Sequence, residues 1–156
     1  MIYQSHCLNQ KQSNNFPNKN FLIHLIQTQK SAPVSLSEAV GLQRIGFHLA
    51  TIPPGKESFI YHSHQFEEEF IFILSGKGIA EIDNQEFEVS SGDFIGFPTP
   101  SVAHHLRNPF EEDLIYIMGG ERREYEIADF PRLQKRMFRN GKQVQIADLD
   151  NLKPFM

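Results

Sequence analysis

Cysteine and tryptophan are the scarcest residue types in this chain of 156 residues. There is one cysteine, Cys7, and there is no tryptophan. A single thiol cannot form a disulfide within the chain, so the fold must depend on packing rather than on covalent cross-links. The opening residues also lack the basic stretch and apolar run that are typical of a secretory signal. We therefore expect a protein of a reducing, cytoplasmic compartment.

Long apolar runs and a surplus of basic charge are missing too. The apolar stretches, such as residues 70–74, are far shorter than the roughly 20 residues that span a bilayer. The formal net charge is −4 at pH 7, whereas nucleic-acid binding normally requires a basic surface. The basic residues between positions 132 and 139 are expected to form a solvated face. We expect neither a membrane nor a nucleic acid as a partner.

Short segments of strand length dominate the middle of the chain. Hydrophobic residues make up 40% of the sequence, which is enough for the core of one domain. Ser35 and Glu38 have the spacing of a capping box and predict a brief helical turn that ends near Gly41. Turn residues at positions 83–85 and 90–93 separate apolar segments. The predicted strands are residues 45–49, 58–64, 69–74, 78–82, 87–89, 94–97, 102–107 and 114–118. This pattern predicts an all-β sandwich or barrel.

Two histidines, His62 and His64, lie one residue apart in a segment predicted to be a strand. Successive side chains of a strand point to opposite faces, so residues i and i+2 share a face. His62 and His64 can therefore bind one metal ion together. Imidazole is a ligand for zinc, copper, iron and nickel, and a carboxylate from Glu67–Glu69 would also suit manganese.

Glycine, proline and asparagine residues at fixed spacings frame these histidines and a second cluster. The first segment contains Gly55, His62, His64, Glu69 and Gly76. The second segment contains Gly92, Pro98, His104 and Asn108. Together the two segments resemble the two signature motifs of the cupin family. Relative to that family, one more residue precedes His62, one more precedes His104, and Pro100 stands where a glycine is usual.

The resemblance implies a fold and a set of ligands. The fold would be a double-stranded β-helix, the jelly-roll barrel of the cupins, formed by residues 21–120. A flexible polar lead, residues 1–20, would precede the barrel, and a C-terminal arm, residues 121–156, would pack on the barrel or on a partner. The implied metal ligands are His62, His64, Glu69 and His104. Glu68 is an alternative to Glu69, and His105 is an alternative to His104.

Three neutral imidazoles and one carboxylate would leave a divalent ion with a net charge of about +1 and with open coordination positions. We expect one ion per chain, of zinc, manganese, iron, nickel, cobalt or copper. Such a centre attracts a small anionic or oxygen-rich ligand. The resemblance extends to small cupins likened to sugar-phosphate (mannose-6-phosphate type) isomerases, so we expect a metal-dependent enzyme of that kind. A non-catalytic module that binds or senses a small ligand, and a metal-dependent dioxygenase, are the alternatives.

The sequence does not choose a catalytic residue. Isomerisation needs a general base and a cation for any phosphate. Candidate bases are His48, Glu57, Glu81 and His105. Candidate cations are Arg44, Lys56 and Arg107. An open jelly roll leaves strand edges unpaired, so we also expect a homodimer, with the apolar residues 21–26 pairing with the barrel or with a partner's sheet.

Overall fold

The computed structural model describes residues 33–153. The predicted lead, residues 1–20, and the predicted strand at residues 21–26 lie outside the described residues. Within them, one short helix and two 3-10 turns accompany thirteen short strands, and every strand pairing is antiparallel. The expected all-β cupin fold is confirmed.

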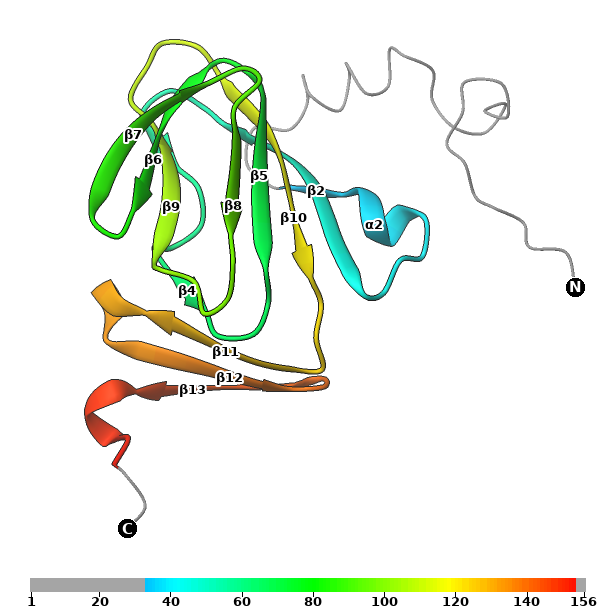
Figure 1. The fold of residues 1–156 in the computed structure, drawn as a ribbon, viewed down its shortest axis with the longest axis vertical. Helices are drawn as coiled ribbons and strands as arrows, with labels where there is room; N and C mark the ends of the chain where they lie inside the picture. Colours follow the sequence, from blue (N-terminus) through cyan, green and yellow to red (C-terminus); the bar gives the residue numbers. More distant parts are fainter. Residues whose placement is uncertain (1–32, 154–156) are drawn as a thin grey trace, which may run out of the picture.

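Two sheets form the barrel (Figure 1). The order of strands in the first sheet is β1 (Val34–Ser35), β2 (Ile45–Ile52), β10 (Leu114–Glu121), β5 (Glu69–Ser75) and β8 (Phe94–Phe97). The order in the second sheet is β3 (Lys56–Glu57), β9 (His104–Asn108), β6 (Lys77–Ile82) and β7 (Gln85–Ser90). Residues from both sheets make up the buried core: Ala50, Ile52, Ile73, Ala80, Val89, Leu106, Leu114 and Tyr116. Their burial removes apolar surface from water and supplies the main driving force for closing the barrel.

A third sheet lies across one end of the barrel (Figure 1). Its strands, in order, are β13 (Gln143–Asp148), β12 (Lys135–Asn140), β11 (Tyr125–Phe130) and β4 (Ser63–His64). The first three belong to the C-terminal arm and form a meander, with the 3-10 turns η1 (Pro131–Leu133) and η2 (Leu149–Asn151) after β11 and β13. Because β11 pairs with β4, the arm lies directly against the segment that carries the His-x-His pair.

Local signals explain the helix and one hairpin. The helix α2 (Leu36–Ala39) begins at Ser35, whose hydroxyl accepts a hydrogen bond from the Glu38 backbone N–H, as the capping pattern predicts. Asp83 and Asn84 both have positive φ and form the two-residue turn between β6 and β7. Such a turn matches the twist of the two strands that it joins.

The predicted strand at residues 58–64 is wrong in its middle. The chain pairs with β9 at Lys56 and Glu57, leaves the sheet, and forms strand again only at Ser63. Phe59 and Ile60 are exposed in the irregular stretch. The Ser58 hydroxyl accepts a hydrogen bond from the Leu106 backbone N–H, so a side chain replaces part of the ladder. Apolar alternation alone could not show this interruption.

Candidate metal centre

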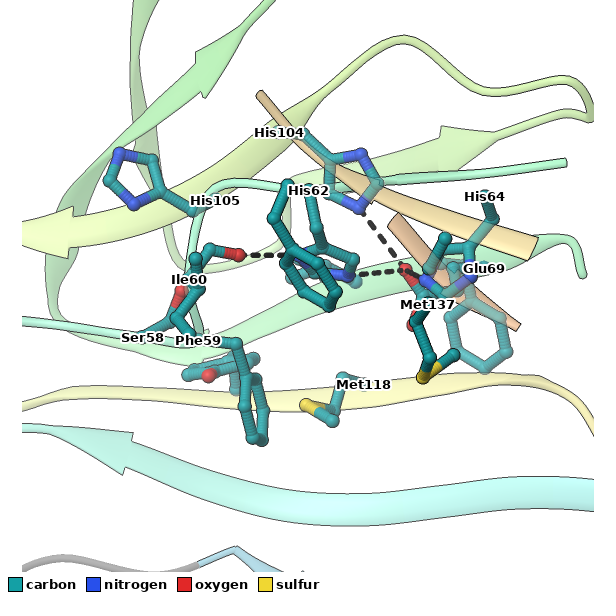
Figure 2. A pocket seen from close by; sticks show the side chains of 15 residues that line it. Ser58, Phe59, Ile60, His62, His64, Glu69, His104, His105, Met118 and Met137 are labelled. Carbon is teal, nitrogen blue, oxygen red and sulfur yellow. Dashed lines mark hydrogen bonds and ion pairs between the residues drawn. The ribbon is translucent and has the colours of Figure 1, made fainter. Parts of the chain in front are cut away.

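Backbone pairing brings His62 and His104 together. The two residues form an isolated antiparallel bridge, with N–H groups donated in both directions between their backbones. His64 follows at the end of β4, and Glu69 begins β5. The three histidines and the glutamate therefore reach one pocket from three different segments of the barrel (Figure 2).

The Glu69 carboxylate lies at the centre of this group. Its Oε2 atom is 3.7 Å from His62 Nε2, 3.2 Å from His64 Nε2 and 3.1 Å from His104 Nε2. Burial alone would raise the pKa of Glu69, but His104, His62 and His64 hold that pKa well below its usual range. The carboxylate is therefore ionised at neutral pH and faces three imidazole nitrogens.

Two of the rings are held with Nε2 directed inward. His62 Nδ1 lies 2.6 Å from the Ile60 carbonyl oxygen, and His104 Nδ1 lies 2.9 Å from the Val102 carbonyl oxygen. A carbonyl oxygen only accepts, so each Nδ1 donates, and in the neutral form of either ring the lone pair would be on Nε2, where it could bind a metal ion. The His104 ring also stacks on Phe97, with centroids 3.5 Å apart.

The surroundings of His64 indicate whether a metal ion fits between these four side chains. Both ring nitrogens of His64 are buried, and within residues 33–153 neither makes a well-formed hydrogen bond, although Nε2 lies 3.2 Å from Glu69 Oε2 and Nδ1 lies 3.6 Å from Glu126 Oε1. Burial lowers the pKa of His64, but the Glu69, Glu126 and Glu67 carboxylates together raise it above its ordinary value. A buried imidazole without partners is costly unless another group satisfies it. A divalent ion at Nε2 would do so, and three imidazoles with one carboxylate suit zinc, manganese, iron, nickel, cobalt or copper.

Glu126 is a site residue that the sequence analysis missed. It lies on β11, its side chain is fully buried, and its Oε1 atom is 3.6 Å from His64 Nδ1. Its carboxylate accepts hydrogen bonds from the backbone N–H groups of Gln65 and Phe66, at 2.9 and 3.2 Å. No spacing rule links residue 126 to residue 64, so only the pairing of β11 with β4 reveals it.

Glu67 and Glu68, the two glutamates that precede Glu69, differ in their surroundings. Glu68 is exposed, whereas Glu67 is buried. Glu67 is paired with Arg139, and it accepts a hydrogen bond from the Arg123 backbone N–H. With His64 and Glu126 it forms a second group with ligand atoms close enough to hold an ion. Backbone N–H groups and Arg139 already occupy those carboxylates, so we assign this group to the support of His64.

The other candidate residues do not face the three histidines. His105 Nε2 lies 2.8 Å from Glu81 Oε2, and Glu81 is also paired with Arg132 of η1. Figure 2 shows His105 to one side of the cluster. His48 lies near Arg122, and Arg107 is paired with Glu86. Glu57, Arg44 and Lys56 are exposed, and none of the three lines the pocket.

A cavity of about 320 Å³ opens above the cluster. Its polar lining consists of Ser58, His62, His64, Glu69, His104, His105 and Tyr116. Its apolar lining consists of Phe59, Ile60, Phe70, Ile71, Met118, Ala128, Phe130 and Met137. Burial first, and then the Glu69 charge, raise the pKa of Tyr116, so its hydroxyl stays protonated. The cavity can hold a small ligand against the four converging side chains.

In sequence, residues 48–120 match the family model of the cupin domain. A crystal structure from Acidithiobacillus ferrooxidans named "Putative sugar phosphate isomerase" superimposes with a TM-score of 0.79 and 34% identity, over 85% of this chain and 94% of that one. A sugar phosphate isomerase of the cupin superfamily from Silicibacter pomeroyi superimposes with a TM-score of 0.72 and 22% identity, over 80% and 79% of the two chains. At that identity it shows the fold alone.

An uncharacterized protein of Methanocaldococcus jannaschii is 39% identical over 59 residues, which are 38% of this chain and 46% of that protein. The match thus spans about half the length of this curated relative. In the described part of the chain, no helix has the length and apolar character to cross a bilayer.

Proposed function

The chain belongs to the cupin superfamily, and we propose that it is a metal-dependent enzyme that acts on a small oxygen-rich ligand. One observation supports this proposal most directly. Three imidazole Nε2 atoms lie 3.1–3.7 Å from one carboxylate oxygen at the base of a cavity. Groups in this arrangement can exchange their mutual contacts for bonds to one divalent ion.

His62, His64, Glu69 and His104 would hold the ion. A bound divalent ion supplies Lewis acidity, which stabilises negative charge on a ligand oxygen. The protein residues have separate tasks. The Ile60 and Val102 carbonyls keep the His62 and His104 rings in the Nδ1–H tautomer, and Glu69 supplies one negative charge.

The pocket also restricts the ligand. Apolar side chains form much of the lining of the cavity beside the cluster. Electrostatic attraction between a ligand oxygen and the site is stronger in such an environment than in bulk water. Over the described range, 33–153, the titratable side chains that line the pocket, apart from the four ligands, are those of His105 and Tyr116. His105 is paired with Glu81, and the Tyr116 hydroxyl is protonated. We therefore propose no general base.

Metal content tests the ligands directly. We expect close to one divalent ion per purified chain, and we expect His62→Ala and His104→Ala each to lose it, because removing one of four ligands weakens affinity severely. His48→Ala is the matched control, since this histidine lies on β2 outside the pocket. Elemental analysis of the folded variants measures the outcome. Full metal content in both ligand variants would reject the site.

The reaction needs a second experiment. The name of the Acidithiobacillus ferrooxidans relative supports aldose–ketose isomerisation of a sugar phosphate as the first reaction to assay. Metal-loaded protein should be incubated with sugar phosphates and with chelating acids, while isomer formation, oxygen consumption and thermal stabilisation are recorded. Isomer formation supports an isomerase and oxygen uptake a dioxygenase. Stabilisation without product under any of the six metals contradicts the proposal of an enzyme.

A further inference from the structure

We infer that the ligand of this pocket has two chemically different halves: an oxygen head of low charge and an uncharged, apolar body. The inference rests on the metal site of the proposed function, because it takes the head to lie against His62, His64, Glu69 and His104, but it disfavours a sugar phosphate as the ligand. It adds the chemical class of the rest of the ligand. The walls of the cavity, the pairing of the nearby arginines and the charge around the cluster each support it.

The apolar side chains that line the cavity around the cluster come from three parts of the fold. Met118 and Phe70 belong to barrel strands, and Phe59 belongs to the irregular stretch after β3. Phe130 and Met137 belong to the arm, outside the residues that the cupin domain model matches. Figure 2 shows Met137 close to Glu69 and Met118 on the side of the pocket away from His104. A ligand body in this space would contact carbon and sulfur atoms.

The arginines near this end of the barrel are already paired. Arg132 is paired with Glu81, Arg136 with Asp129 at 2.6 Å, and Arg139 with Glu67. Among residues 33–153, neither lysine nor arginine lines the cavity. A phosphate group buried against apolar walls without a cation or several N–H donors would lose its hydration without compensation. The walls therefore favour an uncharged body.

The charge of the cluster points the same way. The sequence alone predicts a net charge of about +1 for a divalent ion with Glu69. The structure adds the fully buried carboxylate of Glu126, whose Oε1 lies 3.6 Å from His64 Nδ1. Glu67 and Arg139 offset each other. The carboxylates of Glu69 and Glu126 thus balance the two charges of the ion, and a phosphate dianion would gain little from the site.

The cavity also limits size. Its volume of about 320 Å³ is near the lower end of the roughly 300–1,000 Å³ that is typical of small-molecule sites. Apolar surface that leaves water on binding contributes favourable free energy in proportion to its area. Short-chain carboxylates have one oxygen head and an apolar body of adjustable length, so they are suitable probes of the inferred class.

The test is calorimetric titration of the full chain, loaded with zinc, with acetate, butyrate, hexanoate and glucose 6-phosphate. The metal content is measured first by elemental analysis. A chain that binds no metal contradicts the proposed function. If the chain is loaded with metal, the titrations test the inferred class of ligand separately. We expect affinity to rise about fourfold for each methylene group, and we expect butyrate to bind more tightly than the sugar phosphate. Equal affinity along the carboxylate series, or tighter binding of glucose 6-phosphate, would overturn the inference.

Substitutions in the walls locate the effect. Met137→Ser and Phe130→Ser, both in the arm, should reduce the gain per methylene group. Val144→Ser is the matched control, because this exposed residue lies on β13 of the same arm and away from the cavity. Met118→Ser makes the same test from β10 if an arm variant does not fold. An unchanged gain in all folded wall variants would show that the apolar body does not lie in this cavity.

Discussion

The residues of the proposed metal centre are of two kinds: those that would bind the ion, and those that contact and orient these ligands. His62 and His104 take their tautomers from backbone carbonyls of their own segments. Among the described residues no carbonyl is hydrogen-bonded to His64 Nδ1, and the charged acceptor near this atom is Glu126, at 3.6 Å. The negative charge of a carboxylate in this place favours a proton on the facing Nδ1 and increases the basicity of the ring. One residue of the arm therefore supports one residue of the barrel.

Glu126→Gln tests this support. The amide oxygen can still accept a hydrogen bond from the Gln65 backbone N–H, but the negative charge beside His64 is lost. We expect zinc affinity to fall by about 10–100-fold, which is typical when the partner of a metal-ligating histidine is changed. Competition with a coloured chelator measures the affinity. Glu88→Gln, on exposed β7, is the control, and an unchanged affinity in folded Glu126→Gln would contradict the role.

Elements meet closely at the turn between β5 and β6. Gly76 has a φ of +81°, and a Cβ atom there would lie 2.2 Å from the Asp113 carbonyl oxygen. Gly92 has a φ of +95° but open space around it. The two glycines therefore separate the cost of backbone conformation from the cost of a clash.

Alanine at each glycine measures the two costs. We expect Gly92→Ala to lower the free energy of unfolding by about 1–2 kcal/mol, because an L-residue with positive φ is strained. Gly76→Ala should cost more, since the backbone of residues 113 and 114 must also move. Urea denaturation gives both values. Equal losses would mean that the approach of Gly76 to β10 is looser than the structure indicates.

An ion-paired cluster joins the arm to the barrel at η1. Arg132 of η1 pairs with Glu81 of β6 and lies over the Tyr61 ring, 4.2 Å from its centroid. His105 contacts the other oxygen of the same carboxylate at 2.8 Å. Arg132, and then His105, hold the pKa of Glu81 below its usual range. The basic residues of this run are thus paired with carboxylates, while Arg132 remains exposed to solvent and Lys135 partly exposed, so the expected solvated face is present in part.

The lowered pKa of Glu81 makes its contribution to the free energy of unfolding depend on pH in a defined direction. The ionised Glu81 contributes stability above its unfolded pKa, about 4.3, and this contribution is lost as the pH falls through the lower folded value. The difference in unfolding free energy between wild type and Glu81→Gln should therefore be largest near pH 6 and should shrink toward pH 3. Denaturation at a series of pH values measures it. A difference that is constant with pH would exclude the linkage, and Glu88→Gln supplies the exposed control.

For the whole molecule, metal binding and folding should be coupled. The four proposed ligands come from β4, β5, β9 and the stretch before β4, so an unfolded chain does not hold them together. An ion that binds only the folded state stabilises it by mass action. We expect a chelator to lower the melting temperature and added metal to restore it, whereas His62→Ala should not respond. Calorimetry measures this, and a chelator without effect on metal-loaded wild type would contradict the coupling.

The assembly of the chain is a further prediction at this scale. Within residues 33–153, β8 and β13 have a neighbour on one side only, and Phe94, Val144 and Ile146 are exposed on them. Unpaired edges with apolar side chains are usually covered in the native assembly. We expect a homodimer, so light scattering should report twice the mass of the chain. A monomer at micromolar concentration, unchanged by deletion of residues 1–28, would reject this expectation.

The sequence by itself determined the local features. Alternation in strands placed His62 and His64 on one face, turn residues separated the strands, and Ser35 began the helix, because each feature depends on neighbours within a few residues. The spacing of the two motifs was specific enough to predict the cupin fold. It also favoured Glu69 over Glu68 and His104 over His105 as ligands; the side chains of Glu69 and His104 lie together in the structure, and their binding of a metal stays a prediction.

The tertiary structure alone decided which distant residues surround the cluster. Glu126, Phe130 and Met137 reach it because β11 pairs with β4, about sixty residues earlier in the chain. No periodic pattern encodes a contact of that separation, since it depends on how the arm packs on the end of the barrel. The same packing pairs Arg139 with buried Glu67. The local pattern thus predicts the four proposed ligands, and the long-range packing sets the charge and the apolar walls around them.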